Sequence, residues 1–387
     1  MAAPAKPTII TIDLLRFICA LSVVGFHFGT AFPIQPSPDS AFALQGLSLP
    51  RTMVHGTWFG WIGVELFFVI SGFVIAISAA NSAPLGFFKR RALRLAPAAW
   101  VCATATLIVL ASTGASPLVP LFERWGASLA FLERSPQIDP SYWTLGIELY
   151  FYLFITAGLF FGRSPRHIEG LTIMLGAIST AFWLVVLFSG EDPIQVLVVR
   201  QVQLLLLVHG CFFALGALIW AMIDRGVTAH RVIGCAIFYS VGLIEITTWT
   251  NGQARTPGLA FGVAVPILLF TIGVVLILGS VRFQPWLAKR VPMRHATTIG
   301  LMTYPLYLLH QEIGARIIGA LMNRDIGLVT AALVASGTAI LLAWLIARFV
   351  EPALRRSMAA TIDAIGALMP CRALVPDTLP NAFPRAG

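Results

Sequence analysis

Three ionisable side chains lie inside the first long apolar stretch of the chain, Ile9 to Phe32: Asp13, Arg16 and His27. The stretch is long enough to span a bilayer, where charged groups are costly and usually functional. In an α-helix the eleven-residue step from Arg16 to His27 leaves the two side chains about 20° apart on one face and about 16 Å apart in depth. We interpret the three residues as a polar stripe lining an intramembrane cavity. The alternative is that arginine and histidine snorkel to opposite headgroup regions.

A second carboxylate, Glu148, follows Trp143 in a later apolar stretch. It is expected a turn or two below the outer membrane surface, near the depth of His27. A carboxylate at that depth can fix the imidazole tautomer and support its charged form. The sequence therefore predicts an acid–base pair of His27 and Glu148. Trp143 is read either as an interfacial belt residue or as an aromatic surface for an acceptor.

Other polar residues inside apolar stretches are further candidates. Glu65 needs a partner or a water-filled cavity, and it fits either a structural pairing or the orientation of a catalytic group. His310 fits either helix-to-helix hydrogen bonding or substrate contact. His209 is expected to be structural. The remaining candidates for a supporting or acceptor-side role are Ser71 and Tyr304.

A dense basic loop follows the second apolar stretch, with Lys89, Arg90, Arg91 and Arg94. Anionic lipid headgroups and topology signalling account for most such patches. Arginine at helical spacing also suits phosphate recognition, because its planar fork binds two phosphate oxygens. Both interpretations place this loop at the inner membrane surface.

Composition fixes the class of protein. Hydrophobic residues make up 58% of the 387 residues and charged residues 11%, and the mean hydropathy is +0.85, which excludes a soluble domain. The five cysteines show no close pairing, so neither a disulfide framework, a metal site nor a permanently bound cofactor is expected. The net charge of +9 fits basic cytoplasmic loops better than a nucleic-acid partner.

The apolar pattern predicts an all-α membrane bundle of about ten transmembrane helices. The predicted spans are 9–31, 57–80, 96–113, 141–161, 168–189, 199–222, 232–250, 258–280, 297–321 and 327–350. With the N-terminus inside, the cytoplasmic segments hold seventeen Lys and Arg residues and the opposite side holds five. This bias predicts that both termini are cytoplasmic and that the first span is retained.

Two segments divide the chain. Residues 1–356 form the predicted transmembrane domain. Residues 357–387 contain four prolines and are expected to form a short, loosely ordered cytoplasmic tail. No appended soluble catalytic domain and no strong internal repeat is expected.

Six motifs in the same order resemble the acyltransferase-3 family over about residues 9–352. They are Arg16-x10-His27, Gly63-Val-Glu-Leu-Phe-Phe-Val-Ile-Ser-Gly-Phe73, Arg91-x2-Arg94-Leu-x-Pro97, Trp143-Thr-Leu-x2-Glu148, Tyr304-Pro-Leu-Tyr-Leu-Leu-His310 and Glu351-Pro352. Thr144 stands where many members have serine, which keeps a hydroxyl. The fused C-terminal hydrolase-like domain of longer members is not seen in this sequence.

The resemblance implies a multi-pass enzyme of the bacterial inner membrane. Such enzymes move an acyl group, commonly acetyl, from cytoplasmic acyl-CoA to hydroxyls of exported or surface glycans, or of macrolides and other small molecules. It also implies roles in donor binding and transfer for Arg16, His27, Arg91, Arg94 and Glu148. The expected partners are acyl-CoA as donor substrate, a hydroxyl acceptor and the lipid bilayer.

These expectations combine into one mechanism. Cytoplasmic arginines hold the CoA phosphates, and His27 acts as general base or carries the acyl group briefly, with Glu148 orienting it. The competing class is a proton-coupled transporter or flippase of a lipid-linked or small substrate, which uses the same buried ionisable residues. Hydrolysis or transfer of the acyl group of acyl-CoA by purified protein separates the two classes.

Overall fold

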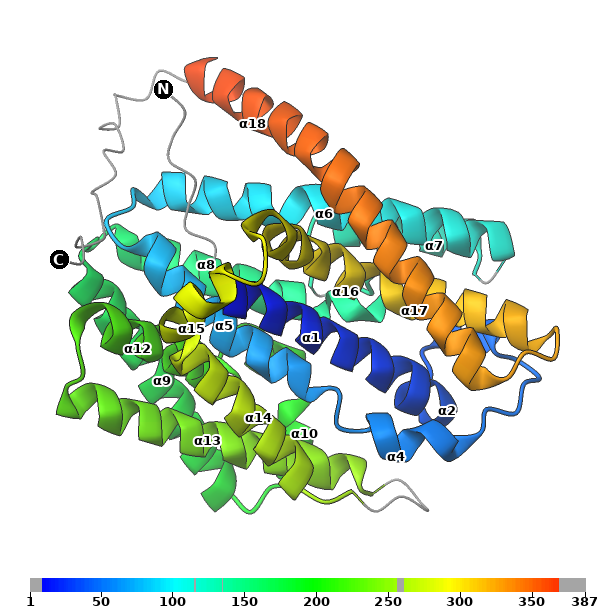
Figure 1. Ribbon diagram of the computed structural model, residues 1–387, viewed down its shortest axis with the longest axis horizontal. Helices are drawn as coiled ribbons and strands as arrows, with labels where there is room; N and C mark the ends of the chain where they lie inside the picture. The colour runs from blue at the N-terminus through cyan, green and yellow to red at the C-terminus, as the bar shows by residue number, and fades with distance from the viewer. Residues whose placement is uncertain (1–8, 115, 134, 256–260, 369–387) are drawn as a thin grey trace.

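The computed structural model describes residues 9–114, 116–133, 135–255 and 261–368, and within these ranges it contains helices and no strand (Figure 1). The all-α prediction is confirmed for this part of the chain. One long helix lies in each predicted span. These helices are α1 (Ile10–Phe26), α5 (Ile62–Ala79), α6 (Pro84–Thr113), α8 (Trp143–Leu159), α9 (Pro165–Phe188), α12 (Gly210–Arg225), α13 (Ala229–Gln253), α14 (Ala264–Leu278), α16 (Met293–Met322) and α17 (Leu328–Leu345).

Shorter helices connect these ten at the two ends of the bundle. They are α2 (Phe32–Ile34), α3 (Pro38–Ala43), α4 (Val54–Thr57), α7 (Leu118–Leu129), α10 (Pro193–Leu197), α11 (Arg200–Leu204) and α15 (Ser280–Ala288). An eleventh long helix, α18 (Glu351–Leu368), follows α17. Two π-helical turns interrupt longer helical segments, His27–Ala31 after α1 and Ile346–Val350 after α17.

Seven helical segments in the described residues are long and apolar enough to cross a membrane. Three long helices are not among these seven. Helices α8 and α12 have only 17 and 16 residues, and α16 contains the polar run His310 to Glu312. The protein is therefore a helical, multi-pass membrane protein. Ten spans and two cytoplasmic termini stay predictions.

Helix α5 lies at the centre of the bundle, packed against α1 and α12. Glycines let the backbones approach closely: a Cβ at Gly216 would lie 1.8 Å from the Val69 carbonyl oxygen, and one at Gly72 would lie 2.0 Å from that of Phe213. On the α1 side, a Cβ at Gly63 would lie 2.5 Å from the Cys19 carbonyl oxygen. Small residues at membrane helix interfaces allow this packing, which fixes how the polar side chains of α1 and α5 are rotated.

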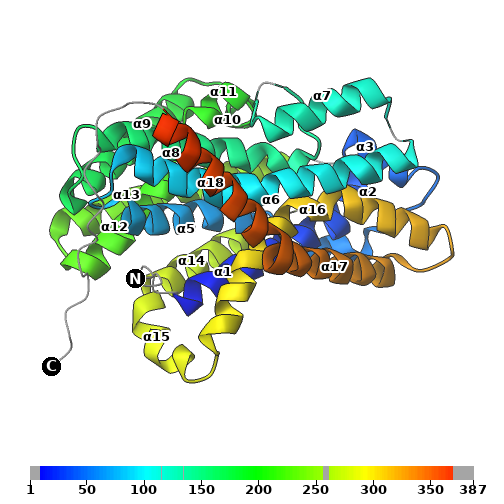
Figure 2. The same ribbon diagram turned by 90° about the horizontal axis from the view of Figure 1, so that it is seen from above.

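Helix α16 packs against α1 and α17 and completes the half of the bundle around α1. Helix α18 leaves the end of α17 and contacts α6, which it crosses in Figure 2. These contacts bring segments from both ends of the sequence around α1. The polar residues of α1, α6, α8 and α16 can therefore form one site.

The two ends of the bundle hold separate polar contacts. At one end, the Asn81 amide donates to the Arg163 carbonyl oxygen at 2.7 Å. At the other end, Asp39 accepts from Ser116 at 2.9 Å and from Arg124 at 2.6 Å. The first pair joins loops predicted to be cytoplasmic and the second joins segments predicted to be outside. Both pairings fit alternating helix directions.

The predicted loose tail needs a correction. Helix α18 begins at Glu351 and continues to Leu368, so residues 357–368 are helical and part of α18. Helix formers such as Leu, Met and Ala are frequent in this segment, and after Pro352, in the first turn of α18, the next proline is Pro370. The rest of the predicted tail, residues 369–387, lies outside the described residues.

Candidate active site

Two histidines, His27 and His310, meet at the end of α1. The Nε2 atom of His310 lies 2.9 Å from Nδ1 of His27, and the ring centroids are 4.8 Å apart. His310 is fully buried and His27 is partly exposed. The sequence predicted both as candidates but did not predict that they touch.

Backbone carbonyls determine the tautomers of this pair in its neutral form. His310 Nδ1 lies 2.8 Å from the Tyr307 carbonyl oxygen, and His27 Nδ1 lies 3.0 Å from that of Val23. A carbonyl only accepts, so we infer that each Nδ1 carries the proton. His310 Nε2 then accepts from His27 Nδ1–H. The lone pair of His27 Nε2 is left available to take a proton from a substrate.

The local sequence places His27 in an unusual turn. His27 is the first residue of the π-helical turn His27–Ala31, and the Phe32 amide donates to the His27 carbonyl. Thr30 and Thr57 share a hydrogen bond of 2.8 Å across to α4, and a Cβ at Gly29 would lie 2.5 Å from Thr57 Oγ1. Single π-helical turns occur often at functional sites. This turn rotates His27 toward α16.

Three arginines form a second group: Arg94 of α6 interacts electrostatically with Arg16 of α1 and with Arg91 of α6. Arg16 lies 4.0 Å from Asp13 and interacts electrostatically with Arg94 and Glu148. Arg94 donates to Glu351 at 3.3 Å. The carboxylates Asp13, Glu148 and Glu351 lie beside these arginines. A guanidinium that exchanges its carboxylate for a ligand can bind phosphate or another anion.

Aromatic rings and a hydroxyl hold Arg91. Its guanidinium lies 5.6 Å from the Phe87 ring centroid and 5.7 Å from that of Tyr152, and it donates to Ser78 Oγ. Cation–π contacts fix a guanidinium without neutralising its charge. Arg91 therefore keeps positive charge available in the arginine group.

Glu148 belongs to this arginine group in the structure, which corrects its predicted pairing with His27. Ser71 donates to Glu148 Oε1 at 3.4 Å, and the Tyr152 hydroxyl donates to the same oxygen. Among the described residues, no hydrogen bond joins Glu148 to His27. The two residues were matched by depth alone, but the rotation of α8 turns Glu148 toward Ser71. A role of Glu148 in charge balance or donor binding stays a prediction.

Tyr304 reaches the same group from α16. Its hydroxyl is buried without a hydrogen-bond partner among the described residues, and it interacts electrostatically with Glu148 and Arg94. An unpaired buried hydroxyl costs free energy, which a bound ligand group can recover. Ser71 and Tyr304 thus both interact with Glu148, and their supporting role stays a prediction.

Glu65 and Trp143 lie elsewhere. Glu65 Oε2 is 3.8 Å from His209 Nδ1, and His209 also contacts Glu245. The Trp143 ring centroid is 6.0 Å from that of His209. Of the two interpretations of Glu65, the structure favours pairing with other buried groups over contact with His27.

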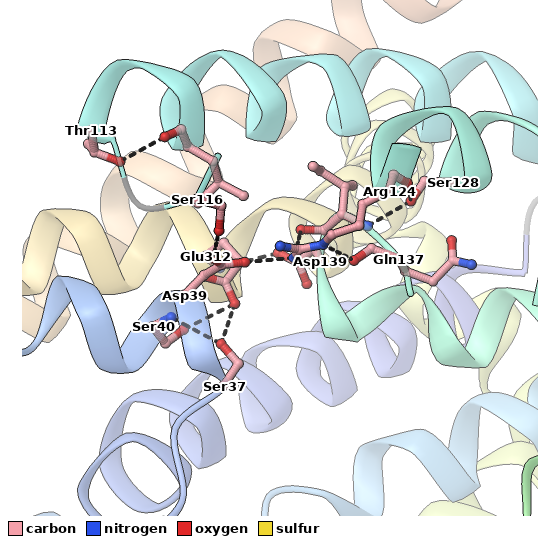
Figure 3. A network of polar contacts seen from close by, with 12 residues as sticks. Ser37, Asp39, Ser40, Thr113, Ser116, Arg124, Ser128, Gln137, Asp139 and Glu312 are labelled. Atoms are coloured by element: carbon pink, nitrogen blue, oxygen red, sulfur yellow. Dashed lines mark hydrogen bonds and ion pairs between the residues drawn. The ribbon is translucent and has the colours of Figure 1, made fainter. Parts of the chain in front are cut away.

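A network of polar contacts surrounds Glu312 in the second half of α16, as Figure 3 shows. Glu312 Oε1 accepts from Ser40 at 3.2 Å, and the Glu312 amide donates to Asp139 Oδ2 at 3.2 Å. Arg124 donates to Asp39 at 2.6 Å. The network connects α3, α7 and the segment before α8 to Glu312, two residues after His310. These contacts hold the part of α16 that contains His310.

Burial raises the pKa of the Asp139 carboxyl, which lies outside the membrane-spanning segments, to about 6. Hydrogen bonds from Ser141 and the charge of Arg124 act in the opposite direction but are smaller. The pKa of Asp139 is raised because burial removes the water that would solvate the charged carboxylate.

Several residues of these sites were not predicted from the sequence. Tyr152 lies one helical turn after Glu148, and this spacing could have identified it. Glu312 is a carboxylate in an apolar stretch, two residues after His310, and so carried the same signal as Glu65. Asp139 lies in a loop, where the sequence gives no sign of burial. Cys19, Cys102, Cys211 and Cys235 are free thiols, and Cys371 lies outside the described residues.

Curated relatives share parts of this sequence. The exopolysaccharide production protein ExoZ of Rhizobium meliloti is 37% identical over 133 residues, covering 31% of this chain and 42% of the relative. The peptidoglycan O-acetyltransferase OatA of Listeria monocytogenes is 26% identical over 311 residues, covering 72% of this chain and 49% of the relative. OatA of Staphylococcus aureus is 26% identical over 300 residues, covering 70% and 49%. The chain thus spans about half the length of these relatives.

No solved structure matches the chain. The model of one protein family, described as an acyltransferase domain, matches residues 9–348. That range contains His27, His310 and all three arginines of the site. Because the match covers nearly the whole chain, this protein belongs to the acyltransferase-3 family.

Proposed function

We propose that this protein is an O-acetyltransferase of the bacterial inner membrane that moves an acetyl group from cytoplasmic acyl-CoA to a hydroxyl of an exported or surface glycan. The relatives named for peptidoglycan O-acetylation and exopolysaccharide production support a glycan acceptor. A macrolide or other small molecule is the alternative acceptor. The observation that carries the proposal is that the contacts of His27 with Val23 and His310 use only its Nδ1, and that His27 follows Arg16 of the arginine group on one helical segment.

The arginine group suits the donor. CoA carries several phosphate charges, and Arg16, Arg91 and Arg94 provide positive charge between the predicted cytoplasmic surface and the bundle interior. Arg16 and His27 are about 16 Å apart along α1. An extended pantetheine arm can cover that distance, so that phosphates bound at the arginines leave the thioester near His27.

The chemistry needs one base. His27 Nε2 takes the proton of the acceptor hydroxyl while the hydroxyl oxygen attacks the thioester carbonyl carbon. The carbon–sulfur bond then breaks, and the CoA thiolate receives the proton from the imidazolium. In an alternative order, Nε2 attacks the thioester first and passes the acyl group to the hydroxyl.

The test is acyl transfer in a single turnover at saturating acyl-CoA, which separates chemistry from binding. His27→Ala should bind acyl-CoA normally and transfer about 10² to 10⁴ times more slowly. Arg16→Ala should lose donor affinity but keep most of the rate at saturation. The matched control is His55→Ala, which changes an exposed histidine outside the site.

Two results would contradict the proposal. A wild-type rate for His27→Ala would make His27 structural. Purified wild-type protein that neither transfers nor hydrolyses the acyl group of acyl-CoA, yet moves a lipid-linked substrate across vesicles, would favour a flippase.

A further inference from the structure

A second cluster of ionisable side chains lies on the side of α5 that faces away from α1. It consists of Glu65 in the first turn of α5, His209 just before α12, and Glu245 in α13. These side chains are buried, with exposed fractions of 6%, 3% and 2%. His209 Nδ1 lies 2.6 Å from Glu245 Oε1 and 3.8 Å from Glu65 Oε2. The proposed acyl transfer does not use them.

The charge of this cluster is not balanced by the surrounding protein. Two carboxylates share one imidazole, and Glu65 Oε2 and Glu245 Oε2 are buried without a hydrogen-bond partner among the described residues. Arg200 acts on His209 electrostatically, but its guanidinium donates to Glu133 and to the Trp143 carbonyl oxygen. Burying carboxylates unpaired is costly, so a proton or a metal ion must neutralise them.

The geometry fits a metal ion. One ligand atom from each of the three side chains lies within 4.8 Å of the other two. Zinc bonds of about 2.0–2.2 Å to nitrogen and oxygen in a tetrahedron require ligand atoms about 3.4 Å apart. The observed separations of 2.6 and 3.8 Å lie on either side of that value, so small side-chain rotations suffice.

We propose that Glu65, His209 and Glu245 bind one zinc ion, which ties α5, α12 and α13 together. One imidazole and two carboxylates form a ligand set that zinc accepts, with Glu245 Oε2, which has no hydrogen-bond partner among the described residues, as the fourth ligand atom. The neighbouring Phe68 ring, 4.9 Å from the His209 ring centroid, excludes water from one side of the site. A bound ion would remove the unpaired negative charge and stabilise the packing of the three helices. The role is structural and separate from the His27–His310 pair.

The test uses the full-length protein, produced in zinc-supplemented cells and purified in detergent. Elemental analysis should find about one zinc per chain. A chelator such as 1,10-phenanthroline should lower Tm by several degrees, and added zinc should restore it. Glu65→Gln/Glu245→Gln keeps the side-chain shapes but removes both anionic ligands, so its zinc content should fall at least tenfold. The matched control, Glu169→Gln, changes a buried carboxylate paired with Arg231 and should keep the metal.

If the double variant fails to fold, measurements on the wild-type protein still test the proposal. Cobalt substitution should then give the intense visible absorption of a four-coordinate site. The proposal would be overturned if wild-type protein held far less than one zinc per chain and neither the chelator nor added zinc changed its Tm. An unchanged zinc content in a folded double variant would also overturn it. The carboxylates would then share a proton.

Discussion

At the scale of single residues, His310 positions the imidazole that the proposed chemistry uses. Its Nε2 accepts from His27 Nδ1, which favours the tautomer with a free Nε2 on His27. His310→Ala should slow single-turnover transfer at least tenfold, with acyl-CoA affinity unchanged, because the wrong His27 tautomer becomes populated. His310→Gln, whose carbonyl oxygen can still accept, should recover part of the rate.

A purely structural His310 gives a different pattern. Its variants would lower the amount of folded protein while the rate per folded molecule stayed at the wild-type value. Measuring Tm together with the transfer rate distinguishes the two outcomes.

Asp139 makes the outer network sensitive to pH. Its pKa is raised from 3.8 to about 6, so the folded protein binds this proton more tightly than the unfolded chain does. The corresponding stability is fully present below about pH 3.8 and is lost as pH rises to about 6, by roughly 3 kcal/mol at most. Asn at this position cannot ionise. The Tm of the wild type should therefore fall relative to that of Asp139→Asn as pH rises from 4 to 6.5. A constant difference across that range would contradict the raised pKa.

At the scale of elements, α6 contains two of the three arginines proposed to bind the donor, Arg91 and Arg94. Arg94 of α6 contacts Glu351, where α18 begins. Arg91→Ala/Arg94→Ala should raise the Kd for acyl-CoA at least tenfold while membrane insertion and Tm change little, because phosphate contacts are lost. Arg94→Lys should give a smaller loss, since a point charge replaces a fork.

The control for the donor site is Arg166→Ala, which removes an exposed arginine in the first turn of α9, on the side predicted to be cytoplasmic. Isothermal titration in detergent measures both. If the double variant and this control bind acyl-CoA equally well, the basic segment of α6 only sets the membrane topology or contacts lipid headgroups.

At the scale of the whole molecule, the polar contacts divide between the two ends of the bundle. Asn81 and Arg163 meet at one end, so reporter fusions after either residue should report the same side, which we predict to be the cytoplasm. Fusions near Gln35 and Asn251 should report the outer side. The physical reason is the bias of basic residues toward cytoplasmic loops. A periplasmic signal at Arg163 would contradict ten spans with both termini inside.

The sequence by itself determined that one long helix lies in each of the ten predicted spans and which polar residues each of these helices contains. Apolar runs about as long as the bilayer is thick must satisfy their backbone groups internally, which dictates helices. The shared face of Arg16 and His27 follows from the period of a single helix. The closeness of Arg91 and Arg94 follows from their spacing in one basic segment, which lies in α6. Each of these features depends only on residues close together in the chain.

Only the tertiary structure decided which polar residues meet. His27 contacts His310, which lies 283 positions away, while Glu148, expected beside His27 from its depth, turns toward Ser71. Glu65 likewise faces His209 and Glu245. Depth along a helix can be counted from the sequence, but rotation about its axis cannot, because the packing of all neighbouring helices sets it. In this bundle the contacts at Gly63, Gly72 and Gly216 fix that rotation.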